Sequence, residues 1–314
     1  MAGQTWAPDS SGGFLASDFL SKKVRHASQP LLRFRQFARK EPGYGKNKGD
    51  VINFDRVTNV VTGGGTISEL SKMPEDNFTL SQGQVIVNEY GNSIPFTGKL
   101  EALADLSLDS VIIKALRNDM AKVLDSAVGT VMRTAALKAI ATGTDTAPTT
   151  TFETTLATTA TRHAQVADVK NVIDTMKSTY KVAPFDGENY MCVCSVGFAR
   201  KIKDDPDWED SAKYGDPERL FAGEIGRYYG VRFIEETNVL SNIVGAAQLY
   251  NGEAIFFGED PIVEGVAIAE ELRYKIAQDY GRDKGLAWYG IMGWALSYNS
   301  ASAGQLRAVQ FTSA

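Results

Sequence analysis

The sequence predicts a mixed α+β protein in which long extended segments and one long helix form most of the regular structure. Three observations lead to this fold class. Residues 50–62 and 84–90 alternate β-forming and polar side chains, which is typical of strands. Residues 106–141 carry apolar side chains at spacings of three and four, the period of an amphipathic helix. Three further strand-like stretches lie between residues 272 and 311.

Length and composition limit the class of protein. The chain has 314 residues, enough for two domains of ordinary size. Hydrophobic residues make up 43% and charged residues 23%, as in soluble globular proteins. No run approaches the roughly 18 to 20 apolar residues of a transmembrane helix, and residues 1–13 lack the apolar core of a signal peptide. We therefore expect a protein that is neither secreted nor inserted in a membrane.

The first 48 residues are predicted to form an extended basic arm. Nine basic residues and one acidic residue lie between Lys22 and Lys48, whereas the rest of the chain has 24 basic and 37 acidic residues. A basic arm on an acidic body favours either a polyanion or an acidic neighbouring copy as its partner. Phe34 and Phe37 are expected to be exposed, because a segment of this composition buries little apolar surface by itself.

The two strand-like stretches at residues 50–62 and 84–90 are predicted to pair as a long hairpin. Three consecutive glycines, Gly63, Gly64 and Gly65, follow the first stretch and break its pattern. Such a hairpin has little to pack on within its own chain. We therefore expect it to rest on a neighbouring subunit.

The helix predicted over residues 106–141 would be about 50 Å long at 1.5 Å per residue. Asp105 or Ser107 can cap its start, and Gly143 can close its end. Residues 142–161 are rich in Thr, Ala and Gly and are predicted to be a linker or surface loop.

The inventory of reactive side chains argues against an enzyme, a cofactor site or a metal site. A hydrolase triad needs a nucleophile, a base and an orienting acid, but the histidines are only His26 and His163, and no Gly-x-Ser-x-Gly sequence occurs. Cys192 and Cys194 have no histidine nearby and are expected to be core residues. The acidic residues 204–210 lack the glycine and final glutamate of an EF-hand loop, which favours a solvated loop.

Four short stretches in the second half of the chain carry a resemblance to a known family: Gly223–Arg227, Gly230–Glu235, Tyr280–Asp283 and Trp288–Trp294. The order of the predicted elements adds to it, with an arm, a hairpin, a long helix, an α/β middle and returning strands. Together they resemble the major capsid proteins of tailed bacteriophages, which have the Hong Kong 97 fold.

The resemblance implies a Hong Kong 97-like division of the chain. Residues 1–48 would be the N-terminal arm, and residues 49–98 the hairpin known as the E-loop. Residues 99–165 would form the peripheral domain with the spine helix, and residues 166–262 the axial domain. Residues 263–314 would be strands that return to the peripheral domain and end at the axial domain.

The function implied by the resemblance is structural. The chain would self-assemble as hexamers and pentamers into an icosahedral phage head that encloses double-stranded DNA. Its partners would be further copies of itself, a scaffolding protein, a portal protein, non-specifically bound double-stranded DNA and a decoration protein, with no membrane. It would assemble in the host cytoplasm and remain in the virion. The alternative is a non-capsid nucleic-acid-binding module that uses the basic arm, although such modules usually have a basic folded face.

Charged residues of the arm and of the hairpin are the candidates for contacts between subunits. They are Arg25, Arg33, Arg35, Arg39, Glu69, Lys72, Glu75 and Asp76. One exposed ion pair contributes only about 0 to 1 kcal/mol, so such contacts would act through repetition over the shell. Some capsids of this fold cross-link through a Lys and an Asn. Lys72 near the hairpin tip has the required amine, but any exposed lysine fits equally well, so no cross-link is predicted.

Overall fold

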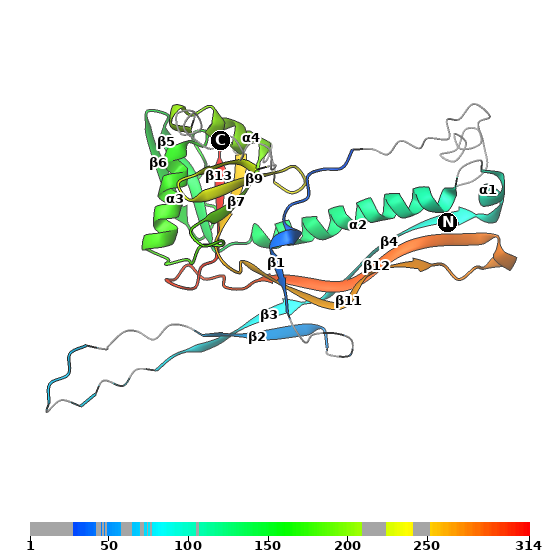
Figure 1. Cartoon of the computed structure of the whole chain (residues 1–314), viewed down its shortest axis with the longest axis horizontal. Coiled ribbons are helices and arrows are strands. Elements are labelled where there is room, and N and C mark those ends of the chain that lie inside the picture. Colours follow the sequence, from blue (N-terminus) through cyan, green and yellow to red (C-terminus); the bar gives the residue numbers. More distant parts are fainter. Residues whose placement is uncertain are drawn as a thin grey trace.

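The computed structural model describes residues 28–41, 45, 47, 49–57, 65–69, 72–73, 75, 77–104, 107–208, 224–240 and 252–314. Within these residues the chain forms three β-sheets and one long helix (Figure 1). A seven-stranded sheet forms one end of the molecule, the long helix α2 runs away from it above a four-stranded sheet, and a two-stranded hairpin protrudes. The predicted α+β class is confirmed. No helix in this part of the chain has the length and apolar character needed to cross a membrane.

The seven-stranded sheet has the order β6-β5-β13-β10-β7-β9-β8. Its strands are β5 (Leu137–Thr144), β6 (Ala147–Glu153), β7 (Tyr190–Ser195), β8 (Glu224–Tyr228), β9 (Val231–Glu236), β10 (Gly252–Phe257) and β13 (Ala308–Ser313). All residues of β7, β10 and β13 are buried. These strands therefore lack the polar alternation of a half-solvated sheet.

The central strands of this sheet contribute to two hydrophobic cores, one on each face. Cys192 and Phe256 lie in the first core, which also contains side chains of helices α3 (Val166–Ser178) and α4 (Val196–Lys203). The neighbouring residues Val193 and Ile255 lie in the second core, together with α2. Successive side chains of a strand point to opposite faces, so the same strands join the two cores.

The four-stranded sheet has the order β1-β11-β12-β4 and lies beneath α2 (Figure 1). Its elements are β1 (Ala38–Lys40), β4 (Asn88–Thr97), β11 (Ile262–Tyr274) and β12 (Asp283–Leu296), with the short helix α1 (Gly98–Leu103) after β4. Helix α2 (Leu108–Met132) packs on the sheet through Leu116 and Leu124, which share a core with Trp288. The indole Nε1 of Trp288 donates to Asp119 of α2 at 2.9 Å.

The protruding hairpin consists of β2 (Val51–Val57) and β3 (Leu80–Ile86), paired antiparallel from Val51 opposite Ile86 to Val57 opposite Leu80. The paired strands pack on the body, where Ile52 and Val85 contact Val263 of β11 and the Arg56 guanidinium donates to the carbonyls of Leu296 and Ser297. The hairpin prediction is confirmed, but its second strand is shifted. The strand predicted over residues 84–90 is interrupted at Val87, after which β4 continues into the four-stranded sheet.

The long helix is shorter than the sequence predicts. It has 25 residues and ends at Met132, which gives about 37 Å at 1.5 Å per residue. The periodic apolar residues beyond it, Leu137–Ala141, belong to β5, which pairs parallel to β13. A run of buried apolar residues fits a helix or a strand equally well. Here the backbone pairing with β13 favours the strand.

The linker predicted over residues 142–161 is also wrong in its first half. Strands β5 and β6 pair as a hairpin through residue 153, because threonine is β-branched and favours strands. Across the pair, the Thr142 hydroxyl of β5 hydrogen-bonds to the hydroxyls of Thr149 and Thr151 on β6, at 3.0 and 2.8 Å. Gly143, expected to close the helix, lies in β5 with a φ of +87°.

A buried ion pair fastens this hairpin to α3. The guanidinium of Arg162 donates to both carboxylate oxygens of Asp168, at 2.7 and 2.6 Å, and the two side chains are 2% and 1% exposed. Arg162 also donates to the carbonyls of Thr142 and Thr149 in the hairpin. Asp168 additionally accepts the backbone N–H of Gln165, which caps the start of α3.

We predict that Arg162→Met lowers the free energy of unfolding by about 3 to 5 kcal/mol, because it leaves the Asp168 charge buried without its partner. Urea unfolding of the purified protein measures this loss. The matched control is Arg273→Met, whose partner Glu271 is about half exposed, and it should cost less than about 1 kcal/mol. Equal costs for the two variants would contradict this role of Arg162.

Candidate assembly surfaces

The described residues include no group of three or more His, Cys, Asp or Glu that could hold a metal ion. Cys192 and Cys194 are free and fully buried in β7, which confirms them as core residues. Burial, and then the neighbouring Cys194, raise the pKa of the Cys192 thiol well above its usual value. His163 is exposed at the surface, and its Nδ1 lies 2.8 Å from the Ala314 carbonyl oxygen. His26, Gly63 and Gly64 lie outside the described residues.

The described part of the arm lies across the junction of helix and sheets. Phe34 is fully buried and packs over Gly129 of α2, where a Cβ would come within 2.8 Å of the phenyl ring. Phe37 contacts Phe257 and Phe185, with ring centroids 4.8 and 5.6 Å apart. The prediction that Phe34 and Phe37 are exposed is therefore wrong, because the body of the protein provides the hollows that the arm lacks.

Polar contacts hold the same segment. The carboxylate of Asp125 in α2 accepts the backbone N–H groups of Phe34 and Arg35, at 2.8 and 3.0 Å. The guanidinium of Arg35 pairs with Glu264 at 3.2 Å and with Glu270 at 2.9 Å, both on β11. The arm is thus tied to α2 by its backbone and to β11 by a side chain.

The predicted contact residues of the arm differ in their surroundings. Arg35 makes its ion pairs within its own chain, whereas Arg39 is 73% exposed and lies 3.5 Å from Asp260. Arg33 is half-buried, and Arg25 lies outside the described residues. A role of these arginines between subunits stays a prediction.

The hairpin β2–β3 presents apolar side chains to solvent on the face that does not pack on the body. Val57, Leu80 and Ile86 on its strands are more than half exposed, as are Met73 and Phe78 between the strands. Val57 and Leu80 are direct cross-strand partners and so form one apolar patch. Composition alone does not reveal these residues, because the packing of Ile52 and Val85 decides which face is left open.

The charged candidates of the hairpin are exposed as well. Glu69, Lys72 and Glu75 are all at the surface, and Lys72 lies 2.7 Å from Glu75 of the same chain. Asp76 lies outside the described residues. The structure therefore places three of these four charges at the surface of the same hairpin.

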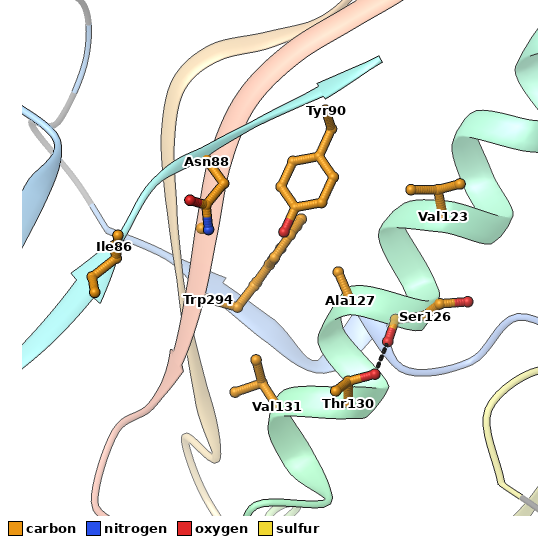
Figure 2. Close-up of a pocket in the computed structure, with 10 residues that line it drawn as sticks. Ile86, Asn88, Tyr90, Val123, Ser126, Ala127, Thr130, Val131 and Trp294 are labelled. Carbon is orange, nitrogen blue, oxygen red and sulfur yellow. Dashed lines mark hydrogen bonds between the residues drawn. The ribbon is translucent and has the colours of Figure 1, made fainter. Parts of the chain in front are cut away.

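A hollow of about 400 Å³ lies between α2 and strands β4 and β12 (Figure 2). Val123, Ala127 and Val131 line it from the helix, and the rings of Tyr90 and Trp294 meet edge to face at 5.6 Å on the opposite wall. Ile86 at the base of the hairpin, Asn88, Ser126, Thr130 and Gly293 complete the lining. We call this hollow the helix groove.

The helix groove and the arm occupy different flanks of α2. The arm contacts the helix at Asp125 and Gly129, whereas the groove is lined by Val123, Ala127 and Val131, which lie on another side of the helix at 100° per residue. One flank of the helix is therefore covered by its own chain, and the other is open.

These features define a protein whose functional surfaces are its extended segments and not a pocket with reactive groups. Comparison with known proteins gives its class. Residues 83–299 match the model of a family described as phage capsid protein. The chain belongs to this family.

Solved structures share the fold over nearly the whole chain. The head structure of Helicobacter pylori bacteriophage KHP40 contains a chain with a TM-score of 0.70 and 13% identity, covering 95% of this chain and 95% of that chain. A chain of the acidic stable capsid of Helicobacter pylori bacteriophage KHP30 has a TM-score of 0.67 and 11% identity, covering 95% of this chain and 94% of that chain. A chain of the capsid of Ralstonia phage GP4 has a TM-score of 0.65 and 15% identity, covering 95% of this chain and 96% of that chain. No curated protein sequence matches the chain.

The chain is a phage major capsid protein, a non-enzymatic component of the head, and it is located in the virion. The predicted Hong Kong 97-like fold and capsid function are confirmed. Capsid assembly implies that copies of the chain associate with one another. The alternative of a non-capsid nucleic-acid-binding module is thereby set aside.

Two buried carboxylates beside the arm make the stability of the subunit depend on pH. Burial raises the pKa of Asp125 and also that of Glu236, to which the Asp125 charge contributes. Glu236 accepts the backbone N–H groups of Val239 and Leu240, at 2.8 and 3.0 Å. Both acids hold a proton more tightly in the folded state. They therefore favour folding most at low pH, and this contribution is lost as the pH rises through their raised pKa values.

In the unmodified protein, the Asp125 contribution makes the free energy of unfolding fall as the pH rises from about 4, near the unfolded pKa of Asp, to 7. We predict that this fall is smaller in the Asp125→Asn variant. The Asn side-chain oxygen can still accept the N–H groups of Phe34 and Arg35. Urea unfolding of unassembled subunits across this range measures the slope. Glu153→Gln should act in the opposite direction and chiefly below about pH 4.3, the ordinary value for Glu, because a hydrogen bond from the Thr158 hydroxyl lowers the pKa of Glu153 in the folded state. If the free energy of unfolding of Asp125→Asn fell more steeply with pH than that of the unmodified protein, the raised pKa of Asp125 would be refuted.

Proposed function

We propose that this chain assembles as hexamers and pentamers into an icosahedral head around double-stranded DNA, and that its hairpin joins neighbouring subunits. The observation that carries the proposal is the exposed apolar face of the hairpin. Apolar side chains that stay in water on a protruding segment mark a surface that binds another protein. Since copies of the chain associate, a second copy is the partner that this surface requires.

The receptor proposed for the hairpin is the helix groove on a neighbouring copy. The groove offers apolar side chains from α2 and the aromatic pair Tyr90 and Trp294. Ile86 belongs both to the exposed face of the hairpin and to the groove. A neighbour's hairpin lying in the groove would therefore also touch the base of the resident hairpin, so that one hairpin follows the next around a capsomer.

The parts of the chain are proposed to match the Hong Kong 97 layout. The arm would comprise residues 1–48 and the E-loop residues 49–98, followed by the peripheral domain at 99–165 and the axial domain at 166–262. Residues 263–314 would return to the peripheral domain and end at the axial domain. The pairing of β11 with β12 and of β12 with β4 supports the return of the chain to the peripheral domain, and the pairing of β13 with β10 supports its end at the axial domain.

Further partners follow from the proposed shell. A scaffolding protein, a portal protein and a decoration protein would bind this chain during or after assembly, and the packaged double-stranded DNA would be bound without sequence preference. The excess of basic residues between Lys22 and Lys48 supports a contact of the arm with a polyanion. The exposed Arg39 guanidinium and the hairpin charges Glu69, Lys72 and Glu75 would add ion pairs between subunits.

Shortening the hairpin tests its role. Val57 and Leu80 are paired in register, so residues 58–79 can be replaced by Asn-Gly, a two-residue turn that closes such a pair. The variant should fold, because the contacts of Ile52 and Val85 with the body remain, but it should not form closed shells. Electron microscopy and sedimentation of the assembly products measure the loss.

Substitutions in the full-length hairpin separate its apolar face from its length. Phe78→Ser combined with Leu80→Thr should reduce the yield of shells, whereas Gln82→Ser, polar for polar on the same face, should assemble normally. Normal shells from the Asn-Gly variant would overturn the proposed role of the hairpin and would leave the capsid function unaffected.

A further inference from the structure

The turn between β11 and β12 presents large apolar side chains to solvent. Tyr274, Ile276 and Tyr280 are 67%, 87% and 105% exposed. The turn from β11 to β12 lies at the end of the four-stranded sheet farthest from the seven-stranded sheet (Figure 1). In a free subunit this cluster is unfavourable in water, and such clusters mark interaction sites.

The backbone of the turn is held in a conformation that directs Tyr280 outward. Asp279 and Tyr280 have φ values of +48° and +51°, and Gly281 follows at +86°. The left-handed region is unfavourable for residues with a Cβ, and such conformations cluster at functional sites. Hydrogen bonds from Gly281 N to Gln278 O and from Arg282 N to Asp279 O fix the turn, at 3.1 and 3.0 Å.

A pocket of about 270 Å³ lies beside this turn. Phe96, Tyr274 and Ala277 provide its apolar walls, so the turn itself forms one side of the pocket. Its polar groups come from Glu101 of α1, Asp109 of α2, Lys275 and Lys284. The ammonium of Lys284 lies 2.7 Å from the Glu101 carboxylate, which links α1 to the sheet at this point. An apolar pocket with polar groups suits a side chain that has an aromatic ring and a hydroxyl. We call it the tip pocket.

We propose that Tyr280 of one copy inserts into the tip pocket of a neighbouring copy. Tyr280 is fully exposed, so it does not fill the pocket of its own chain. Its ring would pack on Phe96, and its hydroxyl would donate to the carboxylate of Asp109. The carboxylates and ammonium groups around the pocket can also pair with Asp279 and Arg282, which flank Tyr280 and carry both signs of charge.

The position of the two surfaces determines the kind of contact. Tyr280 and the tip pocket are different surfaces of one chain, so the contact is heterologous, and repeated around an axis it closes into a ring. Both surfaces lie at the same end of the subunit, so the axis of the ring passes close to that end. The contact rests on the self-association of the chain but is independent of the hairpin and the helix groove.

Tyr280→Gly tests the proposal without impairing the fold. Glycine adopts a positive φ freely, so the urea midpoint of the unassembled subunit should not fall, whereas the yield of closed shells should drop about tenfold or more, as for the loss of an interface hot spot. Tyr280→Phe should retain most of the yield because it keeps the ring. Normal assembly of Tyr280→Gly would overturn the proposal.

Tyr229→Gly is the matched control. Tyr229 also has a positive φ, of +49°, and lies 46% exposed in the turn between β8 and β9. Its replacement should leave the yield of shells unchanged. An equal loss of shells in both glycine variants would show that a general effect of the substitution, and not the tip pocket, is responsible.

Cross-linking tests the contact directly. Two single-cysteine variants, Arg282→Cys beside Tyr280 and Glu101→Cys at the tip pocket, are co-assembled and treated with a short bismaleimide. Cys192 and Cys194 are buried and should not react. The expected product is a covalent dimer that contains one chain of each variant. Heads that yield no mixed dimer would contradict the proposal.

Discussion

The packing of helix α2 across the four-stranded sheet is the constraint on which the rest of the structure depends. Leu116 and Leu124 bury the helix against the sheet, and Asp119 accepts a hydrogen bond from the indole of Trp288. At the far end of the helix, Arg133 pairs with Glu253 of β10 at 2.8 Å. One rigid element thus fixes the distance between the seven-stranded sheet and the turn that carries Tyr280.

The arm completes this arrangement at the junction of the sheets. Phe34 fills the notch above Gly129, Phe37 packs on Phe257, and Arg35 pairs with two glutamates of β11. A segment that is polar and basic in composition is therefore ordered by three side chains and by the Asp125 carboxylate. The Arg35 charge is neutralised within its own chain. Arg39 is therefore more accessible to another molecule than Arg35.

The sequence patterns predicted the elements whose type depends mainly on neighbouring residues in the chain. Alternation in residues 51–57 identified a strand of the hairpin, and helical spacing identified α2. The end of the helix could not be predicted, because the apolar residues Leu137–Ala141 suit both states and only the pairing with β13 selects the strand. The exposure of Phe34 was misjudged for the same reason, since it packs over Gly129, which lies far away in sequence.

The assembly surfaces depend even more on tertiary structure. The sequence pointed to the hairpin and its charges, but the apolar patch of Val57 and Leu80 follows from the face on which Ile52 and Val85 pack. The helix groove and the tip pocket are assembled from three or more elements each. The exposed position of Tyr280 depends on the backbone angles of one turn, which residue types alone do not reveal.

The single residue Val87 between β3 and β4 has a mechanical consequence. It is buried against the body and connects the protruding hairpin directly to a strand paired with β12 over its whole length. A force applied to the distal end of the hairpin is therefore transmitted through β3 and Val87 to the sheet beneath α2. If a neighbouring subunit that holds the hairpin is displaced, the displacement would therefore also act on the four-stranded sheet and helix α2 of this subunit.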